Sequence, residues 1–241
     1  MQDRQDYERL IQACAQGGCI LCRLTQESTQ RYLDMWKYEL FTDVGIREEL
    51  RRSQGFCNTH TWQLADMGAT IQLAQAYRDI LSDTAEQLEG NGSRVPTRGT
   101  PTAAIHKGLL QRWRDQIETR SAERHAPCPV CHYKEQALLR LIPSLRQAVL
   151  DSSFYERLSA SDGLCLDHFQ LACRLKLPGT PARDWLGLLR SAQLACLKRL
   201  DSQLGELIRK HDYRFKDEAR GSEMLSWKRA AGLVAGEDER T

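Results

Sequence analysis

The feature that most constrains this chain is a set of cysteine and histidine motifs that occurs twice. Each copy has a C-x-x-C pair, a gap of 34 or 33 residues that ends in a glycine and one further residue, and then C-x-x-H. The first copy contains Cys19, Cys22, Cys57 and His60, and the second contains Cys128, Cys131, Cys165 and His168. Chance would rarely repeat so many uncommon residues in one order, so the sequence indicates an internal duplication.

The segments around these motifs have helical periodicity. Apolar stripes precede both C-x-x-C pairs, with Tyr7, Leu10, Ile11 and Cys14 in one copy and Ile105, Leu109, Trp113 and Ile117 in the other. Each gap is long enough for two helices. We expect them over 27–40 and 44–52 in the first copy, and over 135–150 and 154–159 in the second. Each C-x-x-H opens a further helix that leads into a long amphipathic one. We therefore expect an all-α fold of two pseudo-symmetric repeats, each organised around its own Cys3His metal site.

The same patterns divide the chain into four parts. The first repeat occupies residues 1–90 and the second occupies residues 104–211. Residues 91–103, between them, are rich in Gly, Pro and Thr, which is typical of a linker. Residues 212–241 form a C-terminal tail, in which the spacing of Met224, Trp227, Ala231 and Val234 predicts a short helix that docks on the body.

The residue types of each copy predict a metal site. The thiolates of a C-x-x-C turn converge on one ion, and C-x-x-H adds the thiolate and imidazole that complete a tetrahedral Cys3His set, which is typical of structural zinc. Two antiparallel helices in the gap would bring its ends together, so each repeat is expected to close its own site. The sequence predicts two Zn²⁺ ions per chain, both contributing to the free energy of folding.

The same ligands also suit other chemistry. Iron–sulfur clusters are held by cysteine thiolates, and histidine replaces some of them in certain clusters. A thiol redox role is a further alternative, but it would use only the C-x-x-C pairs and leave both C-x-x-H pairs unexplained. Cys14, Cys173 and Cys196 lie outside the duplicated pattern, and we expect Cys14 and Cys196 to be core residues.

The letters C-P-V-C-H at residues 128–132 also match the spacing for covalent haem attachment. The first copy has Arg23 where the second has His132, so the axial ligand of such a haem is not part of the duplication. The N-terminal residues also lack the apolar stretch of a secretory signal, whereas haem attachment requires export. We therefore predict no covalent haem and assign His168 as the fourth ligand in place of His132.

Composition and charge narrow the functional classes. No run approaches the roughly 18 apolar residues of a membrane-spanning helix, so no membrane association is expected. Without a secretory signal we expect a cytoplasmic protein, in which nine cysteines stay reduced and need a role other than disulfides. The net charge of +2 makes a nucleic-acid partner unlikely in spite of the basic residues between 94 and 114, and another protein is the expected partner.

Motifs for catalysis are absent from the sequence. The chain has no phosphate-binding glycine loop, no nucleophile elbow and no H-E-x-x-H. A closed four-ligand metal site also leaves no open position for a substrate. These points favour an interaction or regulatory role over an enzyme. An iron–sulfur or thiol redox protein is the first alternative, and a nucleic-acid-binding regulator is the second.

The duplicated units, together with R-G-S-E at 220–223 and Ser226-Trp227 in the tail, resemble an uncharacterised bacterial family with a domain of unknown function. The resemblance covers nearly the whole chain. It implies a cytosolic helical protein with two cysteine–histidine metal sites, and it brings no known activity, substrate or partner.

Overall fold

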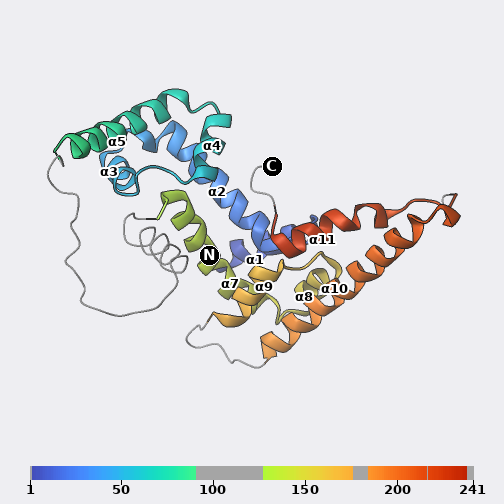
Figure 1. Ribbon diagram of the computed structural model, residues 1–241. Helices are drawn as coiled ribbons and strands as arrows, with labels where there is room; N and C mark the ends of the chain where they lie inside the picture. Colours follow the sequence, from blue (N-terminus) through green and yellow to red (C-terminus); the bar gives the residue numbers. More distant parts are fainter. Residues whose placement is uncertain (1, 91–126, 176–183, 216, 238–241) are drawn as a thin grey trace, which may run out of the picture. The chain divides into compact units, whose positions relative to one another are not determined.

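The computed structural model describes residues 2–90, 127–175, 184–215 and 217–237. All regular structure in these residues is helical, which confirms the all-α prediction (Figure 1). The linker at 91–103, the stripe from Ile105 to Ile117 and the basic residues between 94 and 114 lie outside the described residues. None of the described helices is long and apolar enough to cross a membrane.

The chain forms two compact units, which we call unit 1 (Met1–Gln30 and Tyr133–Thr241) and unit 2 (Arg31–His132). Unit 1 contains the following elements: α1 (Gln2–Cys14), the first part of α2 (Ile20–Tyr38), most of α7 (Pro129–Ala148), α8 (Ser152–Ala160), α9 (Leu166–Arg174), α10 (Asp184–Lys210), η2 (Tyr213–Phe215), η3 (Ser222–Leu225) and α11 (Ser226–Ala235). Unit 2 contains the rest of α2, η1 (Leu40–Thr42), α3 (Val44–Arg52), α4 (Asn58–Asp66), α5 (Thr70–Gly90) and the start of α7.

The short helices α3 and α8, which follow the long helices α2 and α7, begin with the same kind of cap. Asp43 caps α3 by accepting a hydrogen bond from the Ile46 N–H at 2.9 Å, and Asp151 caps α8 by accepting one from Phe154 at 3.0 Å. A side-chain cap of this kind satisfies a backbone donor that the first helical turn leaves unpaired. Both helices lie where the sequence predicts the second helix of each gap.

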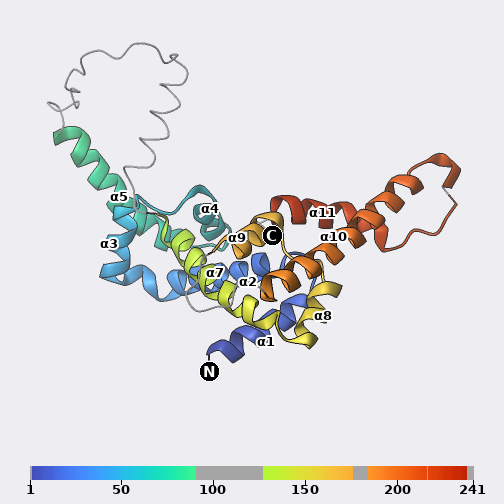
Figure 2. The ribbon, with the colours of Figure 1, turned by 90° about the horizontal axis from the view of Figure 1, so that it is seen from below.

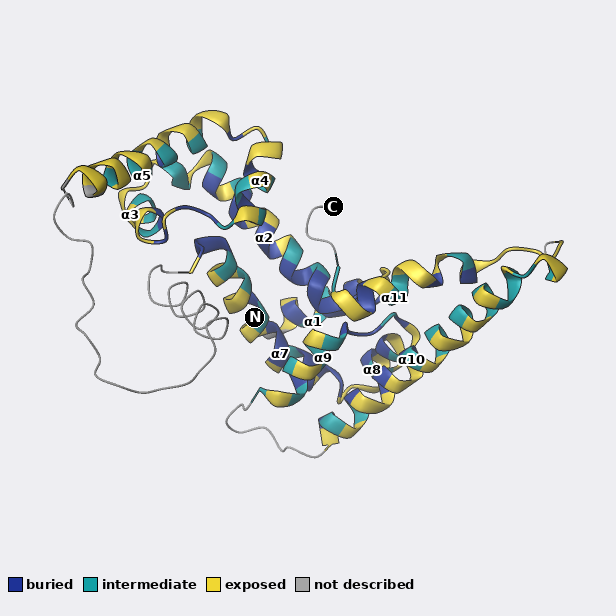
Figure 3. Ribbon diagram, in the orientation of Figure 1, coloured by how far each residue is buried: buried dark blue, intermediate teal, exposed yellow. Residues whose placement is uncertain are grey.

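The core of unit 1 lies around α8, which packs on α1 and along α10. Phe154 and Leu158 on α8 are fully buried, and Leu189 on α10 is buried in the same cluster. Figure 3 shows buried residues in α8 beside exposed ones. Tyr7 brings α1 onto this core, since its ring lies 6.1 Å from that of Phe154 and its hydroxyl donates to Asp151 at 2.9 Å. The predicted N-terminal helix is thus held by this aromatic contact and this hydrogen bond, together with Leu10 and Cys14, which are buried in the same cluster.

The core of unit 2 is smaller. Trp36 from α2 is buried and meets Phe56 edge-to-face, with ring centroids 4.9 Å apart. Leu50 from α3 and Leu64 from α4 complete the centre of this cluster. On the outside, the guanidinium of Arg51 donates two hydrogen bonds to Asp83 of α5, at 2.5 and 2.7 Å.

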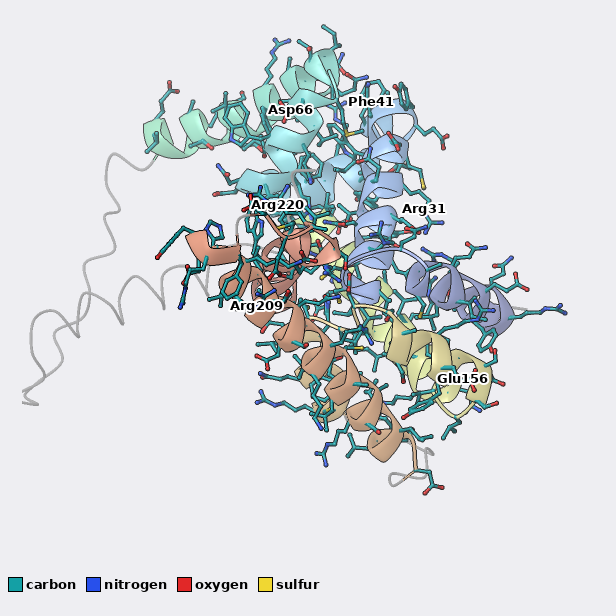
Figure 4. All side chains as sticks on the ribbon, turned by 90° about the vertical axis from the view of Figure 1, so that its right-hand side faces the viewer. Arg31, Phe41, Asp66, Glu156, Arg209 and Arg220 are labelled. Carbon is teal, nitrogen blue, oxygen red and sulfur yellow. The ribbon has the colours of Figure 1, made fainter. Side chains whose placement is uncertain are left out.

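After α10 the chain reverses, and α11 packs back against α10 and α9 (Figures 1 and 2). Arg209 and Arg220 lie at this reversal (Figure 4), where Arg209 pairs with Glu206 and Glu218. The predicted terminal helix is present, but its predicted docking face is wrong. Trp227 and Val234 are 54% and 62% exposed, whereas Ser226, Gly232 and Leu233 are buried. The buried face thus combines two small residues with one leucine, and the spacing of the larger apolar residues does not reveal it.

Candidate metal centres

The eight predicted ligands gather in two clusters, but the pairing crosses the two copies of the motif. Site A consists of Cys19, Cys22, Cys165 and His168, and site B consists of Cys57, His60, Cys128 and Cys131. In each cluster the four ligand atoms lie within 4.8 Å of one another. Site A lies in unit 1 and site B lies in unit 2. The expectation that each repeat closes its own site is therefore wrong.

The length of α2 accounts for this crossing. The sequence suggests two helices of moderate length between the half-motifs, but one helix of 19 residues begins directly after Cys19. At 1.5 Å per residue it is about 28 Å long, whereas the nine-residue helix α3 that follows it is only about 13 Å long. The helix α2 thus carries the chain from unit 1 into unit 2, where Cys57 and His60 lie. The 20-residue helix α7 does the same in the other direction.

All four half-motifs share one local geometry. The first ligand of each pair directly precedes a helix: Cys19 before α2, Cys57 before α4, Cys128 before α7 and Cys165 before α9. The second ligand, three residues later, lies in the first turn. This confirms the prediction that each C-x-x-H opens a helix, and each C-x-x-C does the same. The unpaired N–H groups and positive end of a helix favour thiolates at this position.

A glycine in a left-handed conformation precedes each C-x-x-H. Gly55 has φ of 100° and Gly163 has φ of 77°, a region that L side chains rarely adopt. A Cβ at Gly163 would also lie 2.9 Å from Oε1 of Gln193. This explains physically why a glycine recurs two residues before Cys57 and Cys165.

Gln193 supports site A, although no motif in the sequence includes it. Its Oε1 accepts from the Leu164 N–H at 3.0 Å, and its Nε2 donates to the Leu164 carbonyl at 2.8 Å. The Gly163 N–H donates to the Ser161 hydroxyl at 3.0 Å. The recurring serine of S-Q-G-F-C and S-D-G-L-C is a visible signal for this turn, whereas nothing in the local sequence points to a glutamine on α10.

In site A, the imidazole Nδ1 of His168 faces all three sulfurs. It lies 3.5 Å from Sγ of Cys19, 3.3 Å from Sγ of Cys22 and 3.3 Å from Sγ of Cys165. The sulfurs of Cys22 and Cys165 are 3.7 Å apart. The two half-motifs also meet through the backbone, because the Ile20 N–H donates to the Gly163 carbonyl at 3.4 Å.

Site B has the same arrangement. Nδ1 of His60 lies 3.1 Å from Sγ of Cys57, 3.6 Å from Sγ of Cys128 and 3.5 Å from Sγ of Cys131. The sulfurs of Cys57 and Cys131 are 3.7 Å apart. The two sites therefore present the same four donor atoms at nearly the same separations.

These separations match the edges of a tetrahedron around one ion. Metal–sulfur bonds of ~2.3 Å and a metal–nitrogen bond of ~2.05 Å place two sulfurs about 3.8 Å apart, and sulfur and nitrogen about 3.6 Å apart. A sulfur–sulfur distance of 3.7 Å is far beyond a disulfide bond of ~2.05 Å. Both clusters can therefore hold a metal ion.

Without a cation, clustering makes it costly to ionise several neighbouring thiols at once. Hydrogen bonds to Cys165 and Cys22, with burial, raise the pKa of Cys19, whereas the hydrogen bonds that Cys165 receives from Cys19 and Cys22 lower its own pKa. Burial and the neighbouring Cys128 and Cys57 raise the pKa of Cys131 to about 12. A bound cation would reverse this balance, because it stabilises thiolates directly.

The pKa of the His168 imidazole in site A is raised, whereas burial alone would lower the pKa of a histidine. Burial of the ring disfavours its protonation, but hydrogen bonds to Cys165 and Cys22 and their charge outweigh it, and the pKa of His168 is raised to about 9. A metal ion at site A must therefore displace a proton from this ring as well as from the thiols.

The remaining cysteines and His132 do not join the clusters. Cys14 and Cys196 are 8% and 2% exposed in the helical core, as predicted. His132 is exposed on α7 and is not a member of site B, although it directly follows Cys131. The structure thus places C-P-V-C in a site completed by Cys57 and His60, and the prediction that His168 is its fourth ligand is wrong.

The chain is similar to one family of proteins over most of its length. The profile of a family described as "Family of unknown function (DUF6062)" matches residues 11–241, so the chain belongs to this family. An uncharacterized 23.9 kDa protein in the xynA 3' region of Caldicellulosiruptor sp. (strain Rt8B.4) is 28% identical over 72 residues. That match covers 30% of this chain and only 35% of the relative. No solved structure matches the chain.

Proposed function

We propose that this member of the DUF6062 family is a zinc protein whose two Cys3His sites are structural and whose role is interaction or regulation. The observation that carries the proposal is the geometry of sites A and B, in which four donors from two separate segments stand at the edge lengths of one tetrahedron. Three thiolates and one imidazole are a usual ligand set for structural zinc.

The separations favour a single ion over an iron–sulfur cluster. In a four-iron cluster each ligand binds a different iron, and in a two-iron cluster the four ligands divide between two irons, so donors on different irons stand further apart than around one ion. Cys22 and Cys165 are 3.7 Å apart, and Cys57 and Cys131 have the same separation. In both sites all four donor atoms lie within 4.8 Å of one another, which suits four donors that share one metal. Among single ions, zinc is the usual occupant of such a closed tetrahedral set.

A structural role follows from the ligands' positions in the chain. Cys22 and Cys165 are 143 residues apart, and Cys57 and Cys131 are 74 residues apart, so each ion joins distant segments. The free energy of binding is then available for folding, and it reaches roughly 10–16 kcal/mol in zinc-finger peptides. In a reducing cytoplasm, which we propose as the location, such sites replace disulfides.

We also propose that the chain arose by duplication and that the two repeats exchange halves. Asp43 and Asp151 make equivalent caps, and Gly55 and Gly163 make equivalent turns. Exchange of equivalent elements between copies is the principle of domain swapping, here within one chain. The crossed ligand pairing is what such an exchange produces.

The interaction role rests on the closed ligand set. Four protein donors leave no position for a substrate or an activated water. We propose another protein as the partner, because a net charge of +2 provides little general attraction to the phosphates of a nucleic acid.

Elemental analysis and an absorption spectrum of the full chain, purified without oxygen, test the proposal. We expect two zinc ions per chain and no visible absorption. The Cys173→Ser variant is the matched control, since this cysteine lies on α9 outside both clusters, and it should retain both ions. Fewer than one metal per chain would overturn the proposal. Iron with absorption at about 400 nm would establish the iron–sulfur alternative.

A further inference from the structure

The C-terminal segment of unit 1 is anchored before it reaches site A. Glu223 is 8% exposed, and its Oε1 accepts from Nζ of Lys210 at 2.8 Å and from the Gly221 N–H at 2.7 Å. These bonds hold the pKa of Glu223 at about 2, so the carboxylate stays ionised beside the lysine. The short helix η3, which directly precedes α11, is thereby fixed to the end of α10.

From this anchor α11 runs to the ligands of site A. It packs on α9, the helix that begins after Cys165 and bears His168. Beyond its last residue, Oε1 of Glu237 accepts a hydrogen bond from the Cys19 N–H at 3.1 Å. A Cβ at Gly236 would lie 3.9 Å from Sγ of Cys22. The end of this segment thus meets the backbone of one ligand and lies against the sulfur of another.

Two glycines make room for the Glu237 carboxylate. A Cβ at Gly18 would collide with Oε1 of Glu237, and a Cβ at Gly232 would lie 2.8 Å from the same atom. One glycine directly precedes Cys19, and the other lies on α11, so the carboxylate fits between the metal-binding turn and the terminal helix. The fit depends on the absence of side chains on both sides.

A second connection joins the same two elements. Oδ2 of Asp162 accepts from the Gly18 N–H at 2.8 Å, and Oδ1 of Asp162 lies 3.7 Å from the guanidinium of Arg229 on α11. The N–H groups of Gly18 and Cys19, just before α2, therefore both donate to carboxylates. One carboxylate, Glu237, belongs to the terminal segment, and the other, Asp162, is paired with Arg229 of that segment.

Site B has no such cover in the part of the chain that the structure describes. Among the described residues, no carboxylate is hydrogen-bonded to Cys57, Cys128 or Cys131. Cys57 and Cys131 are partly exposed, whereas the three cysteines of site A are at most 8% exposed. The histidines show the reverse, since His168 is partly exposed and His60 is buried. The thiols of the two sites are thus enclosed to different degrees.

We propose that Glu237 is a positioning residue that holds site A shut, so that site A retains its metal while site B exchanges metal with competing ligands. A chelator must reach a protein-bound ion before it can remove it, and a docked C-terminal segment blocks one approach to site A. Groups that orient ligands from outside the coordination sphere change metal affinity by roughly 10- to 100-fold when altered. The inference rests on the proposed function, since it presupposes zinc in both sites.

The test measures zinc release from the loaded full chain into an excess of the chelating dye 4-(2-pyridylazo)resorcinol. We expect two phases of one ion each. Glu237→Gln, and a chain truncated after Ala235, should accelerate the slow phase about tenfold or more and leave the fast phase unchanged. Glu237→Asp should restore part of the retention. Cys57→Ser, which disables site B, should abolish the fast phase.

Glu218→Gln is the matched control, because Glu218 lies in the same segment and pairs with Arg209, away from site A. The Co²⁺-loaded Glu237→Gln variant should keep the absorption of the unchanged chain, which shows that the four ligands are intact. A slow phase that neither Glu237→Gln nor the truncation accelerates would overturn the inference, as would two ions released at one rate. A chain without zinc would instead overturn the proposed function.

Discussion

Units 1 and 2 hold the same four donor atoms in different surroundings. Site A is surrounded by the core of α8, α9 and α10 and is covered by the end of α11. Site B belongs to a smaller cluster, which includes the ligand Cys128, whereas three ligands of site A, Cys19, Cys22 and Cys165, lie in the larger cluster of unit 1. We therefore expect unit 2 to depend on a bound metal for a larger share of its stability, because a small core holds its ligands in place less firmly without the ion.

Metal removal should expose this difference most strongly. Structural zinc contributes roughly 10–16 kcal/mol in small domains, comparable with the whole stability of a typical domain. On treatment of the full chain with a strong chelator, we expect α3, α4 and α5 to lose hydrogen-exchange protection while α8 and α10 keep most of theirs. Mass spectrometry of the exchanged protein measures this. Earlier loss of protection in α8 and α10 would reverse the proposed dependence.

Double variants should establish the crossed pairing. Cys22→Ser with Cys165→Ser removes two ligands from site A and should leave one zinc per chain. Cys22→Ser with Cys57→Ser damages both sites and should leave almost none. Elemental analysis distinguishes the two, and Cys14→Ser with Cys173→Ser is a control that should retain two. The opposite result, with more zinc in the Cys22/Cys57 pair, would show that each repeat closes its own site.

Acid should release metal from both sites. The pKa of Cys131 is raised to about 12 and that of His168 to about 9, so both groups hold protons at pH 7 until a metal displaces them. For each proton that the metal must displace, the apparent affinity of the site for the metal decreases about tenfold when the pH is lowered by one unit. Dialysis between pH 8 and pH 5 with metal analysis measures the loss, and we expect site B to empty first. Equal retention at both pH values would contradict this.

The metal-free chain should respond to pH in the opposite direction: its stability should rise, not fall, as the pH is lowered. Since the pKa of His168 is raised from 6.5 to about 9, its protonation stabilises metal-free unit 1 fully below pH 6.5, and this contribution is lost as the pH rises through 9. Urea unfolding of the metal-free chain across this range measures it. His168→Gln should remove the dependence, while His132→Gln, at an exposed histidine outside both sites, should not.

The glycine turns should show a smaller effect. Gly163→Ala should cost about 1–3 kcal/mol because of its left-handed φ. Gln193 and the Cys196 sulfur add to this cost, since that sulfur would lie 3.1 Å from the new methyl carbon. Gly55→Ala brings the new methyl carbon to 3.1 Å from the Tyr77 ring and into ordinary contact with Ile80 at 3.7 Å, so it should cost less. Gly187→Ala, on α10 with nothing within 4 Å, should be neutral or stabilising. Thermal unfolding of the zinc-loaded variants measures whether the loss of stability follows this order, from Gly163→Ala to Gly55→Ala to Gly187→Ala.

Much of the site could be predicted because its signals are local. Cys-x-x-Cys and Cys-x-x-His each require only one helical turn to bring two donors together, and the glycine before Cys57 or Cys165 marks the turn that begins the helix. The short helices α3 and α8 are visible from their apolar spacing and their aspartate caps. Gln193 and Glu237 could not be found in this way, since each acts on a turn far away in the sequence.

Residue type and short spacing were enough to predict the helical class and the eight residues that form the two clusters, because they decide which donors converge within a turn. They could not predict which C-x-x-C would pair with which C-x-x-H. The pairing depends on the lengths of α2 and α7, which carry the chain between units, and on the burial of residues such as Trp36 and Phe154. Either C-x-x-H motif offers a C-x-x-C motif the same two donors, so the packing of the helices that carry the motifs determines the pairing.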